Sequence, residues 1–245
     1  MFRQSALVLA VLLGVLCFAE PAQAQSVSFD LGDGGSITAT SIQLIALITV
    51  LSLAPGIAIM ITCFPFIVTV FAILRQAVGL QQSPPNMMIV SLALFLTFFV
   101  MEPVFIEAWT NGVQPLLDEE LAIEEAALRV LDPFRVFMAG RTDPDTFRAM
   151  ADLRPDAATL ELEPETSLAV LVPSFMLSEI ARAFQVGFLI FLPFLVIDLV
   201  VAAVLMSMGM MMVPPAIVSL PFKLAFFVLA DGWALLAGSL VRGYF

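Results

Sequence analysis

Three isolated charged residues, Asp198, Lys223 and Asp231, interrupt the apolar sequence that begins at residue 186. Ionisable groups are costly in a lipid-embedded segment, so they usually face the protein interior or a water-filled path. Asp198 can therefore act as a proton or ion site, or it can form a structural pair with a cation on another helix. Both interpretations require that a second element places a partner beside it.

The spacing of the charges limits how they can pair. Lys223 and Asp231 are eight residues apart, which on a straight helix separates them by ~80° in direction and ~12 Å along the axis. Each therefore needs a partner on another segment or subunit, and the candidates are Glu179, Asp198 or a neighbouring copy. Glu179 and Arg182 are three residues apart, close enough to pair on one helix face.

Methionines gather where the first apolar run ends. Five of the seven residues from 206 to 212 are methionine, namely Met206, Met208, Met210, Met211 and Met212, and Pro214-Pro215 then turns the chain into a second apolar run. Methionine is unbranched and polarisable, so such a cluster conforms to many shapes. The turn is either a deformable seal around something that passes through, or a flexible, well-packed connection between two helices.

The composition predicts a membrane protein built from helices. With 61% hydrophobic and 13% charged residues, several apolar segments approach or exceed the ~20 residues that a spanning helix needs. These runs do not alternate as the strands of a membrane barrel would. We therefore expect an all-α fold of kinked hydrophobic hairpins. The net charge of −11 and the absence of a basic patch make nucleic acid a poor partner.

The chain has no histidine and two cysteines, Cys17 and Cys63. Histidine is the commonest metal ligand and a frequent general base, and Cys17 lies in a segment that we expect to be removed. We expect no catalytic residue, no metal or cofactor and no disulfide, so the protein is not expected to be an enzyme. An intramembrane protease would lack a nucleophile–base pair, and no phosphate loop of the G-x-x-x-x-G-K-S/T type is present.

Five segments follow one another along the sequence. Residues 1–24 have a cationic start, a short apolar core, and the small residues Ala22 and Ala24 before the expected cleavage point, as in a secretory signal peptide. The alternative is a short uncleaved first transmembrane helix. The other four are a polar leader, a first hydrophobic helical region, an acidic extracytoplasmic helical domain, and a second hydrophobic helical region with the Met-rich turn (25–41, 42–108, 109–166 and 167–245).

Prolines near the apolar runs predict bent or broken helices. Pro55-Gly56 and Pro65 should divide residues 42–74 into two helices, because one straight helix of that length would reach ~50 Å. Arg75, in the loop that follows, favours a cytoplasmic side for this loop. The acidic domain would then lie outside the cytoplasm and the Met-rich turn inside.

The acidic domain should contain two helices. Residues 116–138 form a broadly amphipathic pattern that we expect to break at Asp132-Pro133. Residues 143–153 begin with Asp143 followed by proline, which is typical of a capped helix start. Fourteen of the 21 acidic residues fall between Asp118 and Glu179, as expected for a hydrated segment.

Three blocks carry a family resemblance. In chain order they are LRQAVGLQQSPPN with SLALFLTFF, then PSFMLSEI with FQVGF, then GMMMVPP with PFK and DGW (74–86, 91–99, 173–180, 184–188, 209–215, 221–223 and 231–233). Together they resemble the FliP family of flagellar type III export-gate proteins. The related injectisome subunit shares the later blocks, whereas the cleavable signal resembles the flagellar branch.

The resemblance implies a pore-forming core subunit of the export gate, in the bacterial inner membrane at the flagellar basal body. Several copies, about five, would form a helical ring with the Q and R gate subunits. Unfolded flagellar proteins would leave the cytoplasm through it, and the five methionines would seal it as a gasket. The polar residues of structural or inter-subunit role would be Glu179, Arg182, Asp198, Lys223 and Asp231, with Phe137 as an oligomer contact.

The sequence departs from the family pattern in two places. TCFPF at residues 62–66 lacks an arginine that the family commonly has there, and in residues 109–166 only PFRVFM (133–138) and Thr142 match well. The main alternative function is an ion-conducting channel or transporter subunit that uses Asp198 and Glu102. Since an export pore need not bind protons at Asp198, the resemblance favours the structural pair.

The signal peptide generates the first prediction. We expect the mature protein to begin at or near Gln25, because the apolar core before Ala22 and Ala24 is too short to span a bilayer comfortably. N-terminal sequencing of the protein recovered from membranes measures this directly. Recovery of Met1 in the assembled protein would contradict cleavage.

Overall fold

The computed structural model describes residues 37–80, 83–155, 160–210 and 212–245. The chain divides into two compact units, Met1–Thr49 and Val50–Phe245. Every described element is a helix and no strand occurs among these residues, which confirms the all-α expectation for them. The expected signal peptide, with Ala22 and Ala24, lies outside the described residues.

The first hydrophobic region forms α2 (Ile37–Met60), α3 (Phe64–Val78) and α4 (Asn86–Ala108). The predicted division into two helices before Arg75 is confirmed, with the break between Met60 and Phe64. Pro65 stands in the first turn of α3, where its missing N–H removes no helical hydrogen bond. Pro55, which we expected at the break, lies inside α2 instead.

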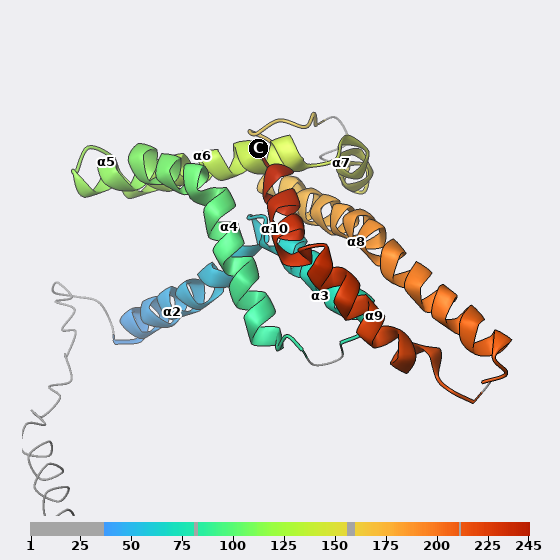
Figure 1. The fold of residues 1–245 in the computed structure, drawn as a ribbon. Coiled ribbons are helices and arrows are strands. Elements are labelled where there is room, and N and C mark those ends of the chain that lie inside the picture. The colour runs from blue at the N-terminus through green and yellow to red at the C-terminus, as the bar shows by residue number, and fades with distance from the viewer. Residues whose placement is uncertain (1–36, 81–82, 156–159, 211) are drawn as a thin grey trace, which may run out of the picture. The chain divides into compact units, whose positions relative to one another are not determined.

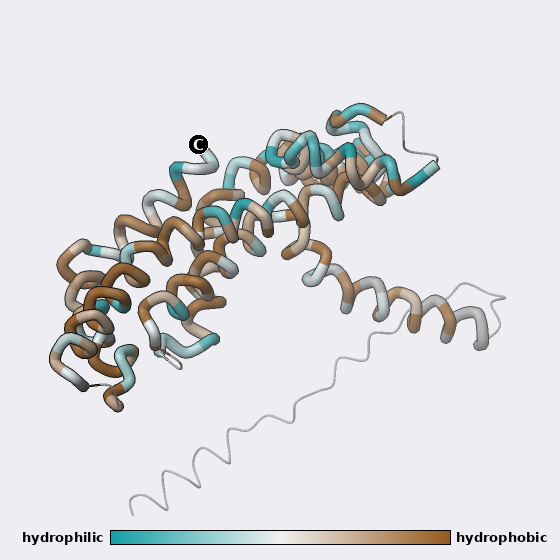
Figure 2. Tube along the Cα trace, turned by 90° about the vertical axis from the view of Figure 1, so that its right-hand side faces the viewer, coloured by the Kyte–Doolittle hydropathy of each residue, from teal (hydrophilic) through white to brown (hydrophobic). Residues whose placement is uncertain are grey.

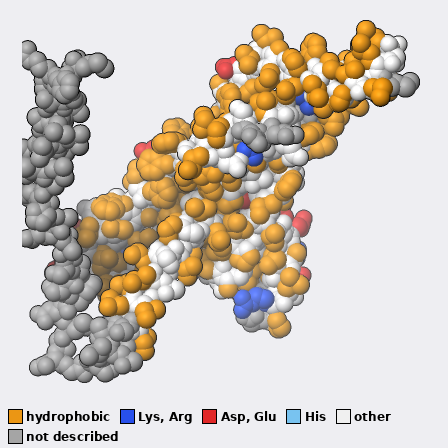
Figure 3. All heavy atoms as spheres, turned by 90° about the horizontal axis from the view of Figure 1, so that it is seen from below, with side chains coloured by type: hydrophobic (Ala, Val, Ile, Leu, Met, Phe, Trp, Pro, Cys, Tyr) orange, Lys and Arg blue, Asp and Glu red, His pale blue; other side chains and the backbone are white. Residues whose placement is uncertain are grey.

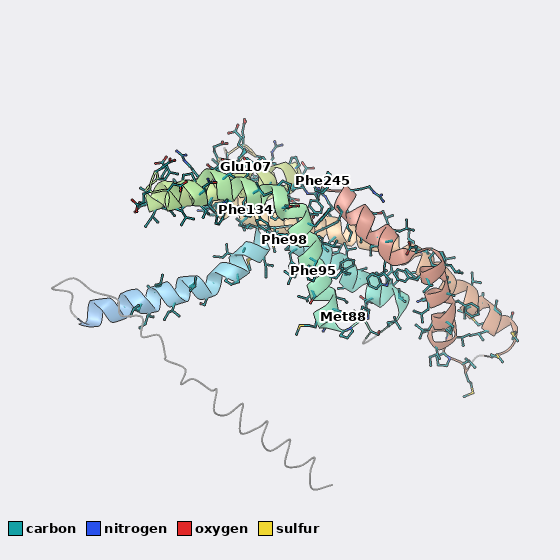
Figure 4. The ribbon with its side chains drawn as sticks, turned by 60° about the vertical axis from the view of Figure 1, so that its left-hand side comes forward. Met88, Phe95, Phe98, Glu107, Phe134 and Phe245 are labelled. Carbon is teal, nitrogen blue, oxygen red and sulfur yellow. The ribbon has the colours of Figure 1, made fainter. Side chains whose placement is uncertain are left out.

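The acidic segment consists of the π-helix η1 (Trp109–Val113), α5 (Gln114–Leu117), α6 (Ile123–Arg141) and α7 (Pro144–Ala151). The predicted break at Asp132-Pro133 is wrong, because α6 continues through a buried Pro133. The next residue, Phe134, packs against Phe105 of α4 with ring centroids 5.9 Å apart. Figure 4 shows Phe134 and Phe98 near the crossing of α4 and α6. Packing against α4 stabilises α6 across the proline.

The start of α7 agrees with the predicted cap. The Asp143 carboxylate accepts hydrogen bonds from the backbone N–H and the hydroxyl of Thr146, both at 2.9 Å. These bonds hold the pKa of the Asp143 carboxyl below its ordinary value. Because the folded pKa is lowered, the cap contributes stability above the ordinary Asp pKa and loses it as the pH falls through the lowered one.

The second hydrophobic region forms α8 (Leu168–Ser207), α9 (Pro215–Leu229) and α10 (Gly232–Arg242). The predicted hairpin is confirmed, since α8 and α9 lie side by side and the Met-rich turn joins them (Figure 1). Pro173 and Pro193 lie inside α8 without ending it. By length and composition 2 helices can cross a membrane, or up to 4 spans if each of two bent helix pairs counts as one.

Helix α3 lies at the centre of the hydrophobic core. Ile67 and Val70 have no exposed surface, and α3 packs against α4, α8 and α9. The outer faces of the surrounding helices remain apolar, with Phe95 of α4 75% exposed and Phe188 of α8 64% exposed. Hydrophobic residues dominate α8 and α9 (Figure 2), and orange side chains cover much of the face in Figure 3. Such faces suit contact with lipid or with other subunits.

Gly112 of η1 generates the second prediction. A Cβ at Gly112 would lie 2.5 Å from Cγ2 and 2.9 Å from the backbone nitrogen of Val130 in α6, so one of the two helices would have to move. We expect Gly112→Ala to lower the free energy of unfolding by roughly 1–3 kcal/mol. Denaturant titration of the detergent-solubilised protein, followed by circular dichroism, measures the change.

Gly140 provides the matched control, because a Cβ there meets nothing within 4 Å and the residue lies inside α6. Gly140→Ala should raise the free energy of unfolding by about 0.5–1 kcal/mol through helix propensity. Equal effects of the two substitutions would show that the close packing of η1 on α6 is wrong.

Candidate functional site: the methionine turn and two buried charge clusters

The methionine turn, residues 206–214, begins where α8 ends in a Schellman arrangement. The N–H of Met210 donates to the carbonyl of Leu205 at 3.0 Å, and the N–H of Gly209 donates to the carbonyl of Met206 at 3.0 Å. Gly209 has a φ of 74°, in the left-handed region where a side chain is strained. The backbone of the turn is therefore well defined on the α8 side, and its first carbonyls are satisfied.

The methionine side chains of this turn are not buried by their own chain. The exposed fraction is 61% for Met206, 65% for Met208, 45% for Met210 and 97% for Met212. Met211, the fifth predicted gasket residue, lies outside the described residues. An ordered backbone that presents adaptable apolar side chains is a surface suited to contact with a partner.

Asp198 and Lys223 pair across the α8–α9 hairpin, with Lys223 Nζ 2.6 Å from Asp198 Oδ2. Ser219, which has no exposed surface, donates its hydroxyl hydrogen to Asp198 Oδ1 at 2.6 Å. Lys223 also donates to the carbonyl of Ala77 at 3.1 Å. That carbonyl lies in the last turn of α3, where helical N–H partners run out. We call Asp198, Ser219 and Lys223 the hairpin ion pair; it joins α3, α8 and α9.

Of the partners that the sequence offered for Lys223, the structure shows Asp198. The Lys223 side chain is 8% exposed and that of Asp198 36%, so the cation is the more deeply buried member. Asp231 does not join this cluster; it precedes α10 with a φ of 49° and its side chain is exposed. Two of the three isolated charges are thus brought together.

A second cluster, the Glu179 node, joins Glu179 to Arg141, Arg182 and Tyr244. Glu179 is 0% exposed. Its Oε1 accepts hydrogen bonds from Nε and Nη2 of Arg141, at 3.3 and 3.2 Å, and lies 3.4 Å from Nη1 of Arg182. Its Oε2 accepts from the Tyr244 hydroxyl at 2.5 Å. The predicted pairing of Glu179 with Arg182 is present, as one of several contacts that offset the burial of the charge.

Arg141 binds the Glu179 node to the residues that follow α10. Its guanidinium carbon lies 4.1 Å from the centre of the Tyr244 ring, within cation–π range. Its Nη1 donates to the carbonyl of Gly243 at 2.9 Å. Burial, followed by the charge of Glu179, raises the pKa of the Tyr244 hydroxyl. The hydroxyl is therefore protonated at neutral pH and donates to the carboxylate.

Phe137 lies beside this node. Its ring stacks on that of Tyr244 with centroids 6.2 Å apart and meets that of Phe175 edge-on at 5.7 Å. These contacts are within one chain, so the role of Phe137 as an oligomer contact stays a prediction. The same holds for any inter-subunit role of Glu179 and Asp198, whose partners named above belong to the same chain.

Sequence reasoning missed Arg141, Ser219 and Tyr244, which are the partners of charges that it had singled out. Tyr244 is the only tyrosine in the chain, and this rarity was the one available signal. In the sequence, Ser219 lies 21 residues from Asp198, and Arg141 and Tyr244 lie 38 and 65 residues from Glu179, so only the fold brings them together. Among the described residues, no group of three or more His, Cys, Asp or Glu could hold a metal ion.

Comparison with known proteins shows the family of the chain. The model of the FliP family matches residues 47–240, which include the hairpin ion pair, the methionine turn and Glu179. The chain belongs to the FliP family. The resemblance drawn from three sequence blocks is thereby confirmed, and the match also takes in the acidic segment between the first block and the second.

FliP-family relatives align with nearly the whole chain. The flagellar biosynthetic protein FliP of Caulobacter vibrioides is 50% identical over 244 residues, covering 98% of this chain and 91% of the relative. That of Agrobacterium fabrum is 49% identical and covers 96% and 97%. That of Bacillus subtilis is 43% identical and covers 88% and 97%.

The Glu179 node generates the third prediction. Arg141→Ala removes two hydrogen bonds to a carboxylate with no exposed surface, so we expect a loss of about 3 kcal/mol in the free energy of unfolding. The matched control is Arg129→Ala, since Arg129 pairs with Glu125 at 2.7 Å on the surface, with side chains 47% and 54% exposed. That pair should contribute at most ~0.5 kcal/mol.

Denaturant titrations of both variants in the same detergent measure the difference. The two arginine substitutions remove the same charge from the same helix, α6, so general charge effects cancel. Similar losses for Arg141→Ala and Arg129→Ala would mean that the node does not stabilise the fold.

Proposed function

We propose that this chain is a pore-forming core subunit of a flagellar type III protein export gate. In this proposal, several copies surround a narrow pore through which unfolded flagellar proteins pass, and the methionine turns of the copies seal it. Membership of the FliP family supports the setting, since the relatives carry the name flagellar biosynthetic protein. The apolar helices support placement in a membrane.

The observation that carries the proposal is the contrast between the α8–α9 hairpin and its tip. The hairpin is held by a partly buried ion pair and capped by a Schellman arrangement, yet Met212 at its tip is 97% exposed. A stable shaft that carries adaptable apolar side chains suits a seal. Flexible thioethers can pack against their copies in an empty pore and mould around a chain that passes through. A narrow apolar constriction also excludes ions by dewetting.

The wider assembly belongs to the same proposal. From the resemblance to the FliP family we infer a homo-oligomer of about five copies, which would close as a ring through heterologous contacts, together with the Q and R gate subunits. The proposed setting is the bacterial inner membrane, with the acidic segment 109–166 outside the cytoplasm and the methionine turn facing inward. Arg75, which was predicted in the loop, lies in the last turn of α3. It donates to Asn86 Oδ1 at the start of α4 and thereby ties together the two ends of the loop that would face the cytoplasm.

The alternative, an ion-conducting subunit that uses Asp198, receives less support from the contacts. Both carboxylate oxygens of Asp198 hold a donor at 2.6 Å, Lys223 on one and Ser219 on the other. A carboxylate held by a lysine and a hydroxyl in this way is suited to joining helices. A path for small ions would instead need a series of charges along one route, and Glu102 lies on a different helix, α4.

Replacement of the methionines generates the fourth prediction. A variant with Met208, Met210, Met211 and Met212 changed to Gly should still assemble, because the hairpin ion pair and the Glu179 node are untouched. The same variant should make membranes leaky, since a glycine ring leaves the constriction open. Release of a small dye from vesicles that contain the purified assembly measures the leak, and native mass spectrometry counts the copies.

Two controls make this test specific. Met87→Gly with Met88→Gly removes two methionines at the start of α4 that are 78% and 62% exposed, and should cause no leak. Figure 4 shows Met88 away from the hairpin tip. Asp198→Asn tests the alternative and should also leave the vesicles tight to ions if the acid is structural. If the assembly of the four-methionine variant is as tight as the parent, the turn serves only to pack the two helices and the proposal of a seal is wrong.

A further inference from the structure

A groove separates α8 from α9 and α10 and has a volume of about 570 Å³. Its walls are apolar along most of their length, with Leu189 and Phe194 from α8 facing Phe226 of α9 and Leu235 of α10. Phe66 and Leu74 of α3 also line it. The groove lies on the apolar part of the molecule, where lipid or another protein has to cover it.

One end of this groove is basic. Arg141 and Arg182 line it there, and Glu179 is the acid that contacts both, so two cations face one anion. The Arg182 side chain is 37% exposed and contacts Glu179 through Nη1. A guanidinium carries five N–H donors in a planar fork, so Arg182 can also bind an anion from outside. Asp143 lies nearby, but its carboxylate is held by Thr146.

Arg182 also marks the place where α8 changes character. The part of α8 before it packs against α6 and α7, whereas residues 183–207 contain a single ionisable group, Asp198. The boundary between the polar surroundings and the apolar run therefore lies at Arg182, the level at which lipid phosphates are expected. Basic pockets between membrane helices are typical sites for anionic lipid headgroups.

The length of the groove suits a hydrocarbon chain. From Arg182 to Phe194 it follows α8 for ~18 Å, slightly more than half of a ~30 Å hydrocarbon core. Over that length the lining is apolar, as contact with an acyl chain requires.

We propose that the groove binds one anionic phospholipid, with its phosphate against Arg182 and an acyl chain along α8 between Leu189 and Leu235. The lipid would fill the space that α8, α9 and α10 leave between them, and so stabilise the packing of α10 on the hairpin. This site is independent of the export function, because it requires only that the chain is embedded in a membrane.

Native mass spectrometry of the purified chain in detergent, titrated with phosphatidylglycerol or phosphatidylcholine, tests the proposal. We expect one phosphatidylglycerol per chain, bound about tenfold more tightly than phosphatidylcholine, as one charge-assisted contact allows. Arg182→Gln should abolish this preference and Arg182→Lys should retain part of it. Arg242→Gln removes an exposed arginine of α10 that does not line the groove and should change nothing.

A second pair of variants tests the acyl chain separately from the charge. Leu235→Trp fills the groove from a residue that is 57% exposed, and should reduce binding of both lipids while Arg182 is kept. Leu229→Trp, at a residue 87% exposed that does not line the groove, is its control. Glycerol 3-phosphate distinguishes a free phosphate from a lipid, and it should not compete for the site.

Three outcomes would overturn the proposal. One is equal binding of the two lipids by the parent and by Arg182→Gln. Another is full competition by glycerol 3-phosphate, which would make the site a phosphate site without an acyl chain. The third is that single chains carry lipid while oligomers carry none, which would assign the groove to contact between copies of the chain. Thermal unfolding of Arg182→Gln and Leu235→Trp checks that loss of lipid is not loss of fold.

Discussion

Glu179 places a negative charge where it has no contact with solvent, and such a charge is tolerated only when several donors surround it. The donors come from three different parts of the chain: Arg141 at the end of α6, Arg182 one turn further along α8, and Tyr244 beyond α10. The requirement to satisfy one carboxylate therefore fixes the acidic segment, the long helix and the chain end relative to one another. The ring of Phe137 completes the contact by stacking on Tyr244.

The two charge clusters hold different halves of α8 in place. The Glu179 node fixes the half of the helix that packs on α6 and α7, and the hairpin ion pair fixes the half that packs on α9 and α3. Beyond Asp198 the helix continues for nine residues to Ser207 with apolar side chains, and ends in the methionine turn. The specific polar contacts thus lie in the body of the molecule, and the flexible methionine side chains lie at the hairpin tip. A seal on a rigid support would require this arrangement.

Much of this arrangement follows from local sequence. The cap at Asp143, the break before Pro65 and the hairpin around the methionines depend on residues within a few positions of one another, so local chemistry predicts them. The continuation of α6 through Pro133 could not be predicted in this way, because packing against α4 outweighs the lost hydrogen bond. Helical geometry reduced the partners of Lys223 to a few candidates, but only packing of α8 on α9 decides among them. Among the donors to Glu179, Arg182 was predictable from its three-residue spacing, whereas Arg141 and Tyr244 lie 38 and 65 residues away and carried no local signal.

The Glu179 node also sets an order of events during synthesis. Tyr244 follows Glu179 by 65 residues, and at ~5–20 residues per second the ribosome needs several seconds to supply it. Arg141 and Arg182 are available earlier, but the second carboxylate oxygen has to wait for Tyr244. Before Tyr244 can dock, α8, the methionine turn, α9 and α10 must be made and inserted. Complete pairing of Glu179 therefore requires that the whole hairpin is in place, and a chain arrested before that point leaves Oε2 of Glu179 without its Tyr244 donor.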